Sequence, residues 1–439
     1  MSTTKIVVSD LHLADGSPTL DCFAGSQQTA FAGLLAFFGV KEAPIELIIN
    51  GDCFDFLVTR PYAFDGTIDQ LTALQKIEKI IAAHGPFFAE LRSFIARGGC
   101  TVTFTTGNHD LELCFARVRA RICAAITGQE SDPRVYFCPT RFYRPLPDVY
   151  IEHGNHYDFW NHAIQSLWDE QGQPLTRKPE RITLSMGSRY FQHAAYLLSE
   201  RYPYFDHFEP SMNTTRQIAL LSLLAPASTT ETAQLIMQLL SYPRQALANL
   251  LPGEENIPAR LFEETMVDFV AFQEDMVAQK RDWTAASETQ TAPAELQEFV
   301  QLRGDLSLPL AEAVASVCTP AVYQMGEDVA QGMHAVLQRD PNLRYAIAGH
   351  THMVRHDTIG AQVYLNTASW TRRFAQPEEI TPELLAWLGA PDWDAIPLRD
   401  VTQLIFVLVT ASENGPAQAS LCAWTDDGLD GRGSYRILA

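Results

Sequence analysis

Positive charge is scarce in this chain of 439 residues. Lys and Arg number 32 against 52 Asp and Glu, which gives a formal net charge of -20. This excess of negative charge argues against a protein that wraps a nucleic-acid backbone. It also repels an anionic substrate unless bound cations reverse the sign locally, so a metal site would serve such a substrate.

Paired cysteines and long apolar runs are missing as well. The 8 cysteines include no Cys-x-x-Cys pair, and in a chain of this length we expect them to be reduced and buried. The apolar runs 218–225 and 404–410 fall far short of the roughly eighteen residues that span a bilayer. The first residues contain no apolar signal segment. We therefore expect no transmembrane segment and a cytoplasmic protein.

Short apolar runs that predict strands are present, and the first, over residues 5–9, ends in Asp10-Leu11-His12. Asp10 and His12 lie two residues apart on an extended segment, so they project to the same side and can face one point. One interpretation is a pair of metal ligands. The other is a turn aspartate beside a solvent-exposed histidine, and the pair taken alone favours this second interpretation.

The second predicted strand, over residues 46–50, ends in a glycine and two carboxylates, Asp52 and Asp55. Asp52 stands at the strand tip, where each oxygen of a carboxylate can bind one cation. Asp55 fits an outer partner of such a site and a helix cap equally well.

The third predicted strand, over residues 101–105, leads into Asn108, His109 and Asp110. Taken alone, such a run is usually turn chemistry. In open α/β sheets, however, ligands bind beyond the carboxyl ends of the strands. Helical patterns between the strands predict crossovers of an α/β fold.

Two later strands follow the same rule, so five strand ends carry ligand-type side chains. These side chains are Asp10, His12, Asp52, Asn108, His109, His153, His350 and His352. Mixed imidazole, carboxylate and amide ligands suit divalent Mn, Fe, Zn or Ni. The set is too large for one tetrahedral ion and matches two ions that share a carboxylate. Two ions about 3.5–4 Å apart can bind a bridging hydroxide for in-line attack on a phosphoryl group.

In this order the motifs resemble the five motifs of the calcineurin-like metallophosphoesterases. They are Asp10-x-His12, Gly51-Asp52-x-x-Asp55, Gly107-Asn108-His109-Asp110, His153-Gly154 and Gly349-His350-x-His352. The resemblance covers residues 1–160 and 340–435. It implies an α/β fold, a four-layer α/β sandwich of two mixed β-sheets flanked by helices. It also implies two divalent metal ions, and manganese is the favoured metal.

The resemblance also implies a role for each residue. Asp10, His12, Asp52 and His352 would hold the first ion, and Asp52, Asn108, His153 and His350 the second. His109 would not be a ligand but would lie over the phosphate and protonate the leaving oxygen, with Asp110 orienting its ring. A free imidazole can act in this way when a carboxylate keeps it protonated.

Residues 160–339 show helical periodicity with an exposed polar stretch at 285–293. We interpret them as a mostly helical insertion between the two halves of the catalytic domain, residues 1–160 and 340–439. The insertion begins at the rim of the predicted site, so it is either a lid over the substrate or an element for oligomerisation or structure.

The predicted reaction is hydrolysis of a phosphomonoester, a phosphodiester or a pyrophosphate. The predicted substrate is a phosphorylated small molecule or a lipid-linked compound. The sequences around Asp10 and at 366–370 are similar to those of the UDP-2,3-diacylglucosamine diphosphatases, whereas the sequence at 153–158 differs from theirs. A DNA nuclease and an inactive binding scaffold are less favoured, because the net charge is negative and every ligand position is filled. Arg189, Arg201, Arg355 and Arg372 are candidates for binding phosphate.

Overall fold

The computed structural model describes residues 3–158 apart from 19, 24, 41–43 and 62–66. Between 159 and 324 it describes only 161, 167–169, 171–175, 180–185, 188 and 207–209. From 325 to 439 the gaps are 376–381, 391–395, 413–414 and 426–432. The chain divides into two units, and every predicted metal ligand and catalytic residue belongs to the first, which comprises Met1–Gln192, Met325–Arg373 and Asp400–Ala439.

A seven-stranded mixed sheet in this unit has the strand order β16-β15-β14-β1-β2-β4-β5. Its strands are β1 (Thr3–Val8), β2 (Ile45–Asn50), β4 (Cys100–Thr105), β5 (Val135–Phe137), β14 (Leu404–Ala411), β15 (Gln418–Thr425) and β16 (Ser434–Ile437). The strands β1, β2, β4 and β5 run parallel, whereas β14, β15 and β16 form antiparallel pairs. The carboxyl ends of the three strands that carry predicted ligands therefore meet at one edge.

A five-stranded mixed sheet has the order β11-β12-β10-β7-β6. Its strands are β6 (Phe142–Leu146), β7 (Val149–Glu152), β10 (Tyr345–Ala348), β11 (Val354–Ile359) and β12 (Gln362–Thr367). The central strands β7, β10 and β12 run parallel, so Val149 pairs with Tyr345 from the other end of the sequence. This pairing brings the loop after β7 next to the loop after β10.

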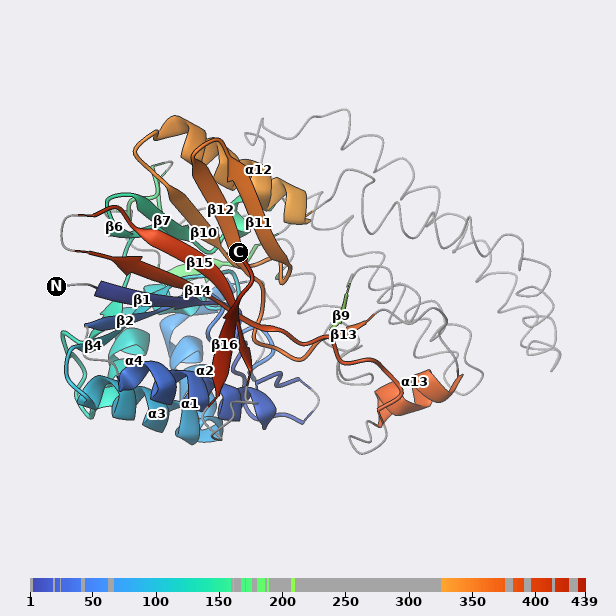
Figure 1. The fold of residues 1–439 in the computed structure, drawn as a ribbon. Coiled ribbons are helices and arrows are strands. Elements are labelled where there is room, and N and C mark those ends of the chain that lie inside the picture. The colour runs from blue at the N-terminus through green and yellow to red at the C-terminus, as the bar shows by residue number, and fades with distance from the viewer. Residues whose placement is uncertain are drawn as a thin grey trace, which may run out of the picture. The chain divides into compact units, whose positions relative to one another are not determined.

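Four helices cover one face of the larger sheet (Figure 1). They are α1 (Ser26–Gly39), α2 (Gln70–Ala83), α3 (Gly85–Ala96) and α4 (Ala116–Thr127). The chain breaks between α2 and α3 at His84, and Pro86 lies in the first turn of α3, where its missing N–H costs nothing. The apolar faces of these helices share one buried cluster with Ile6, Leu47 and Val102 of the sheet.

The opposite face of the larger sheet packs against the five-stranded sheet. Val7 and Ile48 share a buried apolar cluster with Val149 and Ile347. The outer face of the smaller sheet is covered by α12 (Met325–Arg339), whose Met333 is buried with residues of β10 and β12 (Figure 1). The predicted class, α/β with two mixed sheets and helices, is confirmed.

Two strands that the sequence analysis does not predict, β6 and β11, lie at the two edges of the smaller sheet, one at each edge. Pro145 interrupts the pattern of β6, and β11 carries Arg355, His356 and Asp357 in succession. Edge strands tolerate proline and charge because one side of their backbone needs no partner. The same residues remove the apolar pattern by which a strand is recognised.

Most of the predicted insertion lies outside the described residues, and its extent stays a prediction. At its start, β8 (Arg181–Thr183) pairs with β3 (Thr67–Asp69) within the first unit. The second unit comprises His193–Gln324 and Phe374–Arg399. In its described part, β9 (Phe208–Glu209) pairs with β13 (Phe374–Ala375), and α13 (Pro382–Gly389) follows. No helix among the described residues has the length and apolar character to cross a membrane.

Candidate metal centre

The backbone adopts an unusual conformation at the strand ends. Among the described residues, the non-glycine residues with positive φ are Asp10, His12, Asp52, His350, His352 and Ala368. Residues other than glycine rarely adopt this left-handed backbone conformation, and each instance costs on the order of 1–3 kcal/mol. Such conformations gather at functional sites, and here all but the last occur at predicted metal ligands.

Two motif glycines leave room for neighbouring ligands. A Cβ on Gly107 would lie 2.1 Å from Oδ1 of Asp52, and a Cβ on Gly51 would lie 2.5 Å from Nδ1 of His153. Either methyl group would force a predicted ligand to move. Steric crowding by the ligands thus explains why glycine occupies the position before the ligand in these two motifs.

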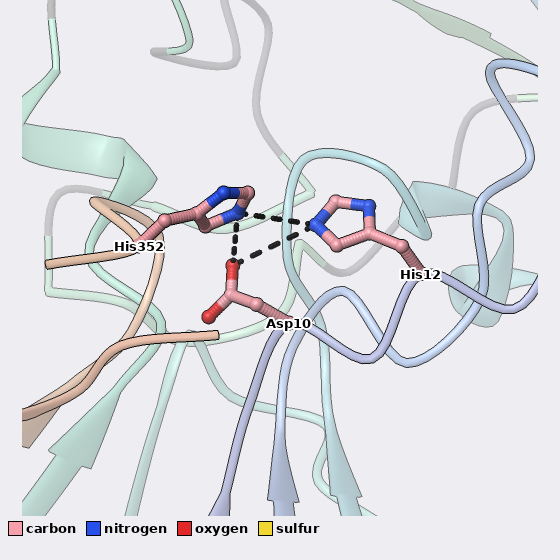
Figure 2. A group of neighbouring side chains, drawn as sticks. All are labelled: Asp10, His12 and His352. Atoms are coloured by element: carbon pink, nitrogen blue, oxygen red, sulfur yellow. Dashed lines mark hydrogen bonds and ion pairs between the residues drawn. The ribbon is translucent and has the colours of Figure 1, made fainter. Parts of the chain in front are cut away.

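Asp10, His12 and His352 form a first cluster of ligand-type atoms (Figure 2). Oδ1 of Asp10 lies 3.1 Å from Nε2 of His352 and 3.9 Å from Nε2 of His12. The two Nε2 atoms are 3.2 Å apart. Asp10 and His12 follow β1 while His352 follows β10, so both sheets contribute to this cluster.

Asp52, His153 and His350 form a second, buried cluster. Nε2 of His153 lies 3.0 Å from Oδ2 of Asp52 and 4.0 Å from Oδ1 of Asp10, so the two clusters adjoin. Nδ1 of His153 lies 2.8 Å from the carbonyl oxygen of Asn50. A proton donated there leaves Nε2 unprotonated toward the cluster, as in histidines that bind metals.

One buried atom at this junction, Oδ1 of Asn108, has no hydrogen-bond partner. Two further buried atoms, Oδ1 of Asp10 and Nε2 of His153, have ion-pair partners, His352 and Asp52. An unsatisfied buried polar atom costs about 1–3 kcal/mol, so that of Asn108 calls for an explanation. All three atoms belong to predicted metal ligands and suit a divalent cation. The donor atoms therefore fit the two metal ions implied by the motifs.

The structure brings together all seven residues predicted to bind metal. Six of them make up the two clusters, and Asn108 lies beside the second, since the next residue, His109, donates its backbone N–H to Oδ1 of Asp52 at 2.8 Å. The assignment of individual ligands to individual ions stays a prediction.

Asp55 connects His109 with the first cluster. Its Oδ2 lies 2.9 Å from Nδ1 of His12 and 3.0 Å from Nδ1 of His109. Its Oδ1 accepts the backbone N–H groups of Leu57 and Val58 at 3.1 and 3.2 Å. One oxygen thus caps a turn, since no helix begins after Asp55, and the other contacts two histidines of the site, so its role as an outer partner of a metal site stays a prediction that these contacts support.

Asp110 is expected from the resemblance to orient the ring of His109, and that role stays a prediction. In the structure the carboxylate beside this ring is Asp55. Asp110 accepts the backbone N–H groups of Gly107 at 2.6 Å and Cys53 at 3.0 Å. It thereby ties the loop that carries His109 to the loop that carries Asp52.

Burial and charge pairing compete at Asp52 and His153. Burial disfavours the carboxylate of Asp52, but the neighbouring His153 and His109 outweigh it and lower its pKa to about 2. Burial likewise disfavours the charged imidazole of His153, but Asp52 and Asp10 raise its pKa to about 9. Without cations, charged pairs hold the second cluster together. A cation that binds His153 must therefore displace a proton.

His109 has a related electrostatic environment. Burial alone would lower the pKa of its imidazole, but the carboxylates of Asp55 and Asp52 outweigh burial and the pKa is raised. The pKa of Asp55 lies well below its usual range, because the charges of His109 and His12 outweigh its burial. An imidazolium beside a permanent carboxylate is the form required of a general acid.

The arginine beside the clusters is one that the sequence analysis does not name. Arg189 and Arg201 lie outside the described residues, and Arg355 lies 2.7 Å from Glu327. Arg373 is buried and contacts Nδ1 of His352. Arg373 directly follows Arg372, so the sequence analysis selects the neighbouring arginine of the same pair.

Comparison with known proteins gives weak likenesses only. No family model matches the chain, and no curated protein matches its sequence. A dimetal phosphatase from Danio rerio is similar at 11% identity, with 100% of this chain and 98% of that chain covered and a TM-score of 0.32. The phosphopantetheinyl hydrolase from Mycobacterium tuberculosis is similar at 12% identity, with 91% and 96% covered and a TM-score of 0.24. Likenesses of this size assign neither fold nor function to this chain.

Proposed function

We propose that this chain is a metal-dependent phosphoester hydrolase of the calcineurin-like metallophosphoesterase superfamily. The observation that carries the proposal is the convergence of seven ligand-type side chains from five strand ends, three in the larger sheet and two in the smaller. Oδ1 of Asn108, one of their donor atoms, is buried without a hydrogen-bond partner. We also infer that the catalytic unit is a four-layer α/β sandwich, which the successive apolar layers between helices and sheets support.

The first ion would be held by Asp10, His12, Asp52 and His352, and the second by Asp52, Asn108, His153 and His350. When bound, two such cations lower the pKa of water and neutralise charge on a phosphoryl group. The chain itself supplies the orientation of these ligands. The oxygens of Asn50 and Asp55 each accept from one ligand imidazole and turn the other ring nitrogen toward the clusters.

His109 would act as the general acid. Asp55 stabilises its protonated ring, and its backbone N–H donates to Asp52, so the residue is fixed at both ends beside the clusters. A proton held on this ring can be given to the leaving oxygen as the phosphorus–oxygen bond breaks. A leaving group that gains a proton departs as a neutral alcohol or as a less charged phosphate.

The proposal is tested by elemental analysis of the purified protein followed by a substrate panel. We expect two divalent ions per chain, with activity that is lost on chelation and restored by Mn²⁺. The panel contains p-nitrophenyl phosphate, bis(p-nitrophenyl) phosphate, a nucleoside-diphosphate sugar and double-stranded DNA. Its first three members separate monoester, diester and pyrophosphate hydrolysis, and the last tests the nuclease alternative. A protein that takes up no ions, or that hydrolyses none of these compounds when loaded, contradicts the proposal.

Hydrolysis of a lipid-linked UDP-sugar pyrophosphate is the narrower alternative, and the nucleoside-diphosphate sugar in the panel addresses it. The role of residues 160–339 as a lid or oligomerisation element stays a prediction. Deleting this segment and measuring selectivity across the panel tests the lid, because unchanged selectivity would contradict it.

A further inference from the structure

The loop after β7 does more for the second cluster than supply His153. Asp158 lies beside His350, and Asn161 lies beside Asn108. Neither Asp158 nor Asn161 belongs to the five motifs. Both nevertheless contact a predicted ligand of the second metal ion.

We propose that Asp158 and Asn161 are positioning residues for the second metal site. Asp158 fixes the ring of His350, and Asn161 fixes the side-chain amide of Asn108. The inference rests on the proposed function, because it takes His350 and Asn108 as metal ligands.

The contact between Asp158 and His350 determines which ring nitrogen is available. Asp158 is fully buried, and its Oδ2 lies 2.9 Å from Nε2 of His350. A neutral imidazole carries its proton on one nitrogen only, and a carboxylate at Nε2 holds the proton there. The lone pair of Nδ1 is then available to a cation.

The contact between Asn161 and Asn108 determines which end of an amide is available. Nδ2 of Asn161 donates to Oδ2 of Asp158 at 2.5 Å, so its Oδ1 is the atom left to accept from elsewhere. That oxygen accepts from Nδ2 of Asn108 at 3.4 Å, a long hydrogen bond. The amide nitrogen of Asn108 is thereby engaged, and its buried Oδ1 is left without a hydrogen-bond partner.

The loop is itself fixed, so these contacts are imposed before a cation binds. Nδ2 of Asn155 donates to the carbonyl oxygen of Asn161 at 3.1 Å, and the backbone N–H of Asp158 donates to the carbonyl oxygen of Asn155 at 3.2 Å. Gly154 has a φ of 110°, and a Cβ there would lie 3.0 Å from Val329 of α12. One short loop thus sets three of the four ligands of the second ion.

The first test measures metal binding by Asp158→Ala, Asp158→Asn and Asn161→Ala. Titration of the metal-free proteins with Mn²⁺ should show affinity for one of the two ions reduced roughly 10–100-fold in Asp158→Ala, with the other unchanged. Asp158→Asn keeps an oxygen that accepts from Nε2 and should lose less. Asn161→Ala should also weaken one ion only.

The matched control is Asp357→Asn on β11. Asp357 belongs to the same unit, and its Oδ2 also lies 2.9 Å from a histidine Nε2, that of His334. This pair lies outside both clusters, so the control should bind two ions with wild-type affinity. Wild-type affinity for both ions in Asp158→Ala would overturn the role of Asp158, and the same result in Asn161→Ala would overturn that of Asn161.

The second test needs no metal and no activity. Long-range ¹H–¹⁵N spectra of metal-free protein labelled at histidine, at a pH at which His350 is neutral, report its tautomer, with His350→Gln giving the assignment. We expect the Nε2–H form in the wild type and in Asp158→Asn, and loss of this preference in Asp158→Ala. An Nδ1–H form in the wild type overturns the inference even if Asp158→Ala fails to fold.

The two proposals fail separately. A wild-type protein that binds no second ion refutes the proposed function, whatever the tautomer of His350. If Asp158→Ala binds both ions with the same affinity as the wild type, only the inference about the loop is refuted.

Discussion

The two clusters of the candidate centre adjoin, yet one includes a partly exposed histidine and the other is wholly buried. In the first, the side chain of His352 is 25% exposed. In the second, the side chains of His153 and His350 are 1% and 4% exposed. Both buried histidines have an oxygen acceptor at the ring nitrogen away from their cluster, the carbonyl of Asn50 and the carboxylate of Asp158.

This difference indicates a division of work within one centre. An enclosed cluster with fixed rings holds its cation in one geometry, because its ligands have little freedom to move. An open cluster exchanges with solvent and gives a substrate oxygen access to its cation. We therefore expect the first site to meet the substrate and the second to be the more rigid.

Asp52→Ala should abolish metal binding in both clusters, because it removes the carboxylate predicted to serve both sites. Its oxygens contact His153 and the backbone N–H of His109. We expect phosphoesterase turnover below detection and loss of metal from both sites, measured by elemental analysis and the substrate panel. Asp357→Asn is the control. Two retained ions with wild-type turnover would contradict the shared role of Asp52.

His109→Ala should separate chemistry from metal binding. Loss of a general acid lowers turnover roughly 10²–10⁴-fold, while both clusters keep all their ligand atoms. We therefore expect wild-type metal content and a large fall in kcat. Asp55→Asn is the informative companion, because Asp55 also contacts His12 and its loss should weaken the first ion as well. Metal loss in His109→Ala would refute the assignment.

Removing one histidine from each cluster should expose the difference in burial. In metal-free protein, His153→Ala leaves the buried charge of Asp52 without its partner, which typically costs about 3–5 kcal/mol. His352→Ala removes a partly exposed partner and should cost at most about 1 kcal/mol. Urea unfolding in the presence of a chelator measures both values. Equal losses would show that the clusters do not differ in this respect.

The fall in stability with rising pH should disappear when cations bind. The pKa of His153 is about 9 in the folded metal-free chain against an ordinary 6.5, so its stabilising effect is complete below pH 6.5 and is lost as the pH rises through 9. The loss amounts to roughly 3 kcal/mol, because one pKa unit corresponds to 1.36 kcal/mol. The pKa of Asp52 is lowered to about 2, so its contribution is present above pH 3.8 and is lost only as the pH falls toward 2.

Urea unfolding between pH 6 and pH 9 checks this prediction, roughly the range in which His153 titrates. The metal-free protein should lose stability as the pH rises across this range. The loaded protein should not, since His153 is then neutral and bound to a cation. His153→Gln should flatten the curve of the metal-free protein, and an unchanged curve in that variant would assign the effect to another group.

The sequence predicts the residues of the centre more completely than the residues that hold them. Asp10, Asp52 and His153 each lie two or three residues beyond the last apolar residue of a run, so their place at a strand end is a local property of the sequence. The partners of Asp158 and Asn161 are His350 and Asn108, and only the folded chain brings these pairs together. Spacing along the sequence carries no trace of such contacts.

The fold shows the same limit. The central strands that carry the site are visible as apolar runs, whereas the edge strands β6 and β11 are hidden by Pro145 and by successive polar residues. How the apolar faces pair was also beyond local patterns, because Val7 and Val149 share a core across two sheets. Local sequence thus predicts elements and ligands, and tertiary contacts decide their supports.

The pairing of β1 with β14 has a consequence for the chain during its synthesis. Thr3 pairs with Ala411, and each cluster includes His350 or His352. At about 5–20 residues per second, a ribosome makes the intervening segment over tens of seconds. Throughout that time β1 presents an unpaired edge, and the acidic residues after β1 and β2 have no complete histidine shell. The two clusters therefore become complete only late in synthesis, and β1 keeps an unpaired edge, a template for pairing with another chain, until β14 is made.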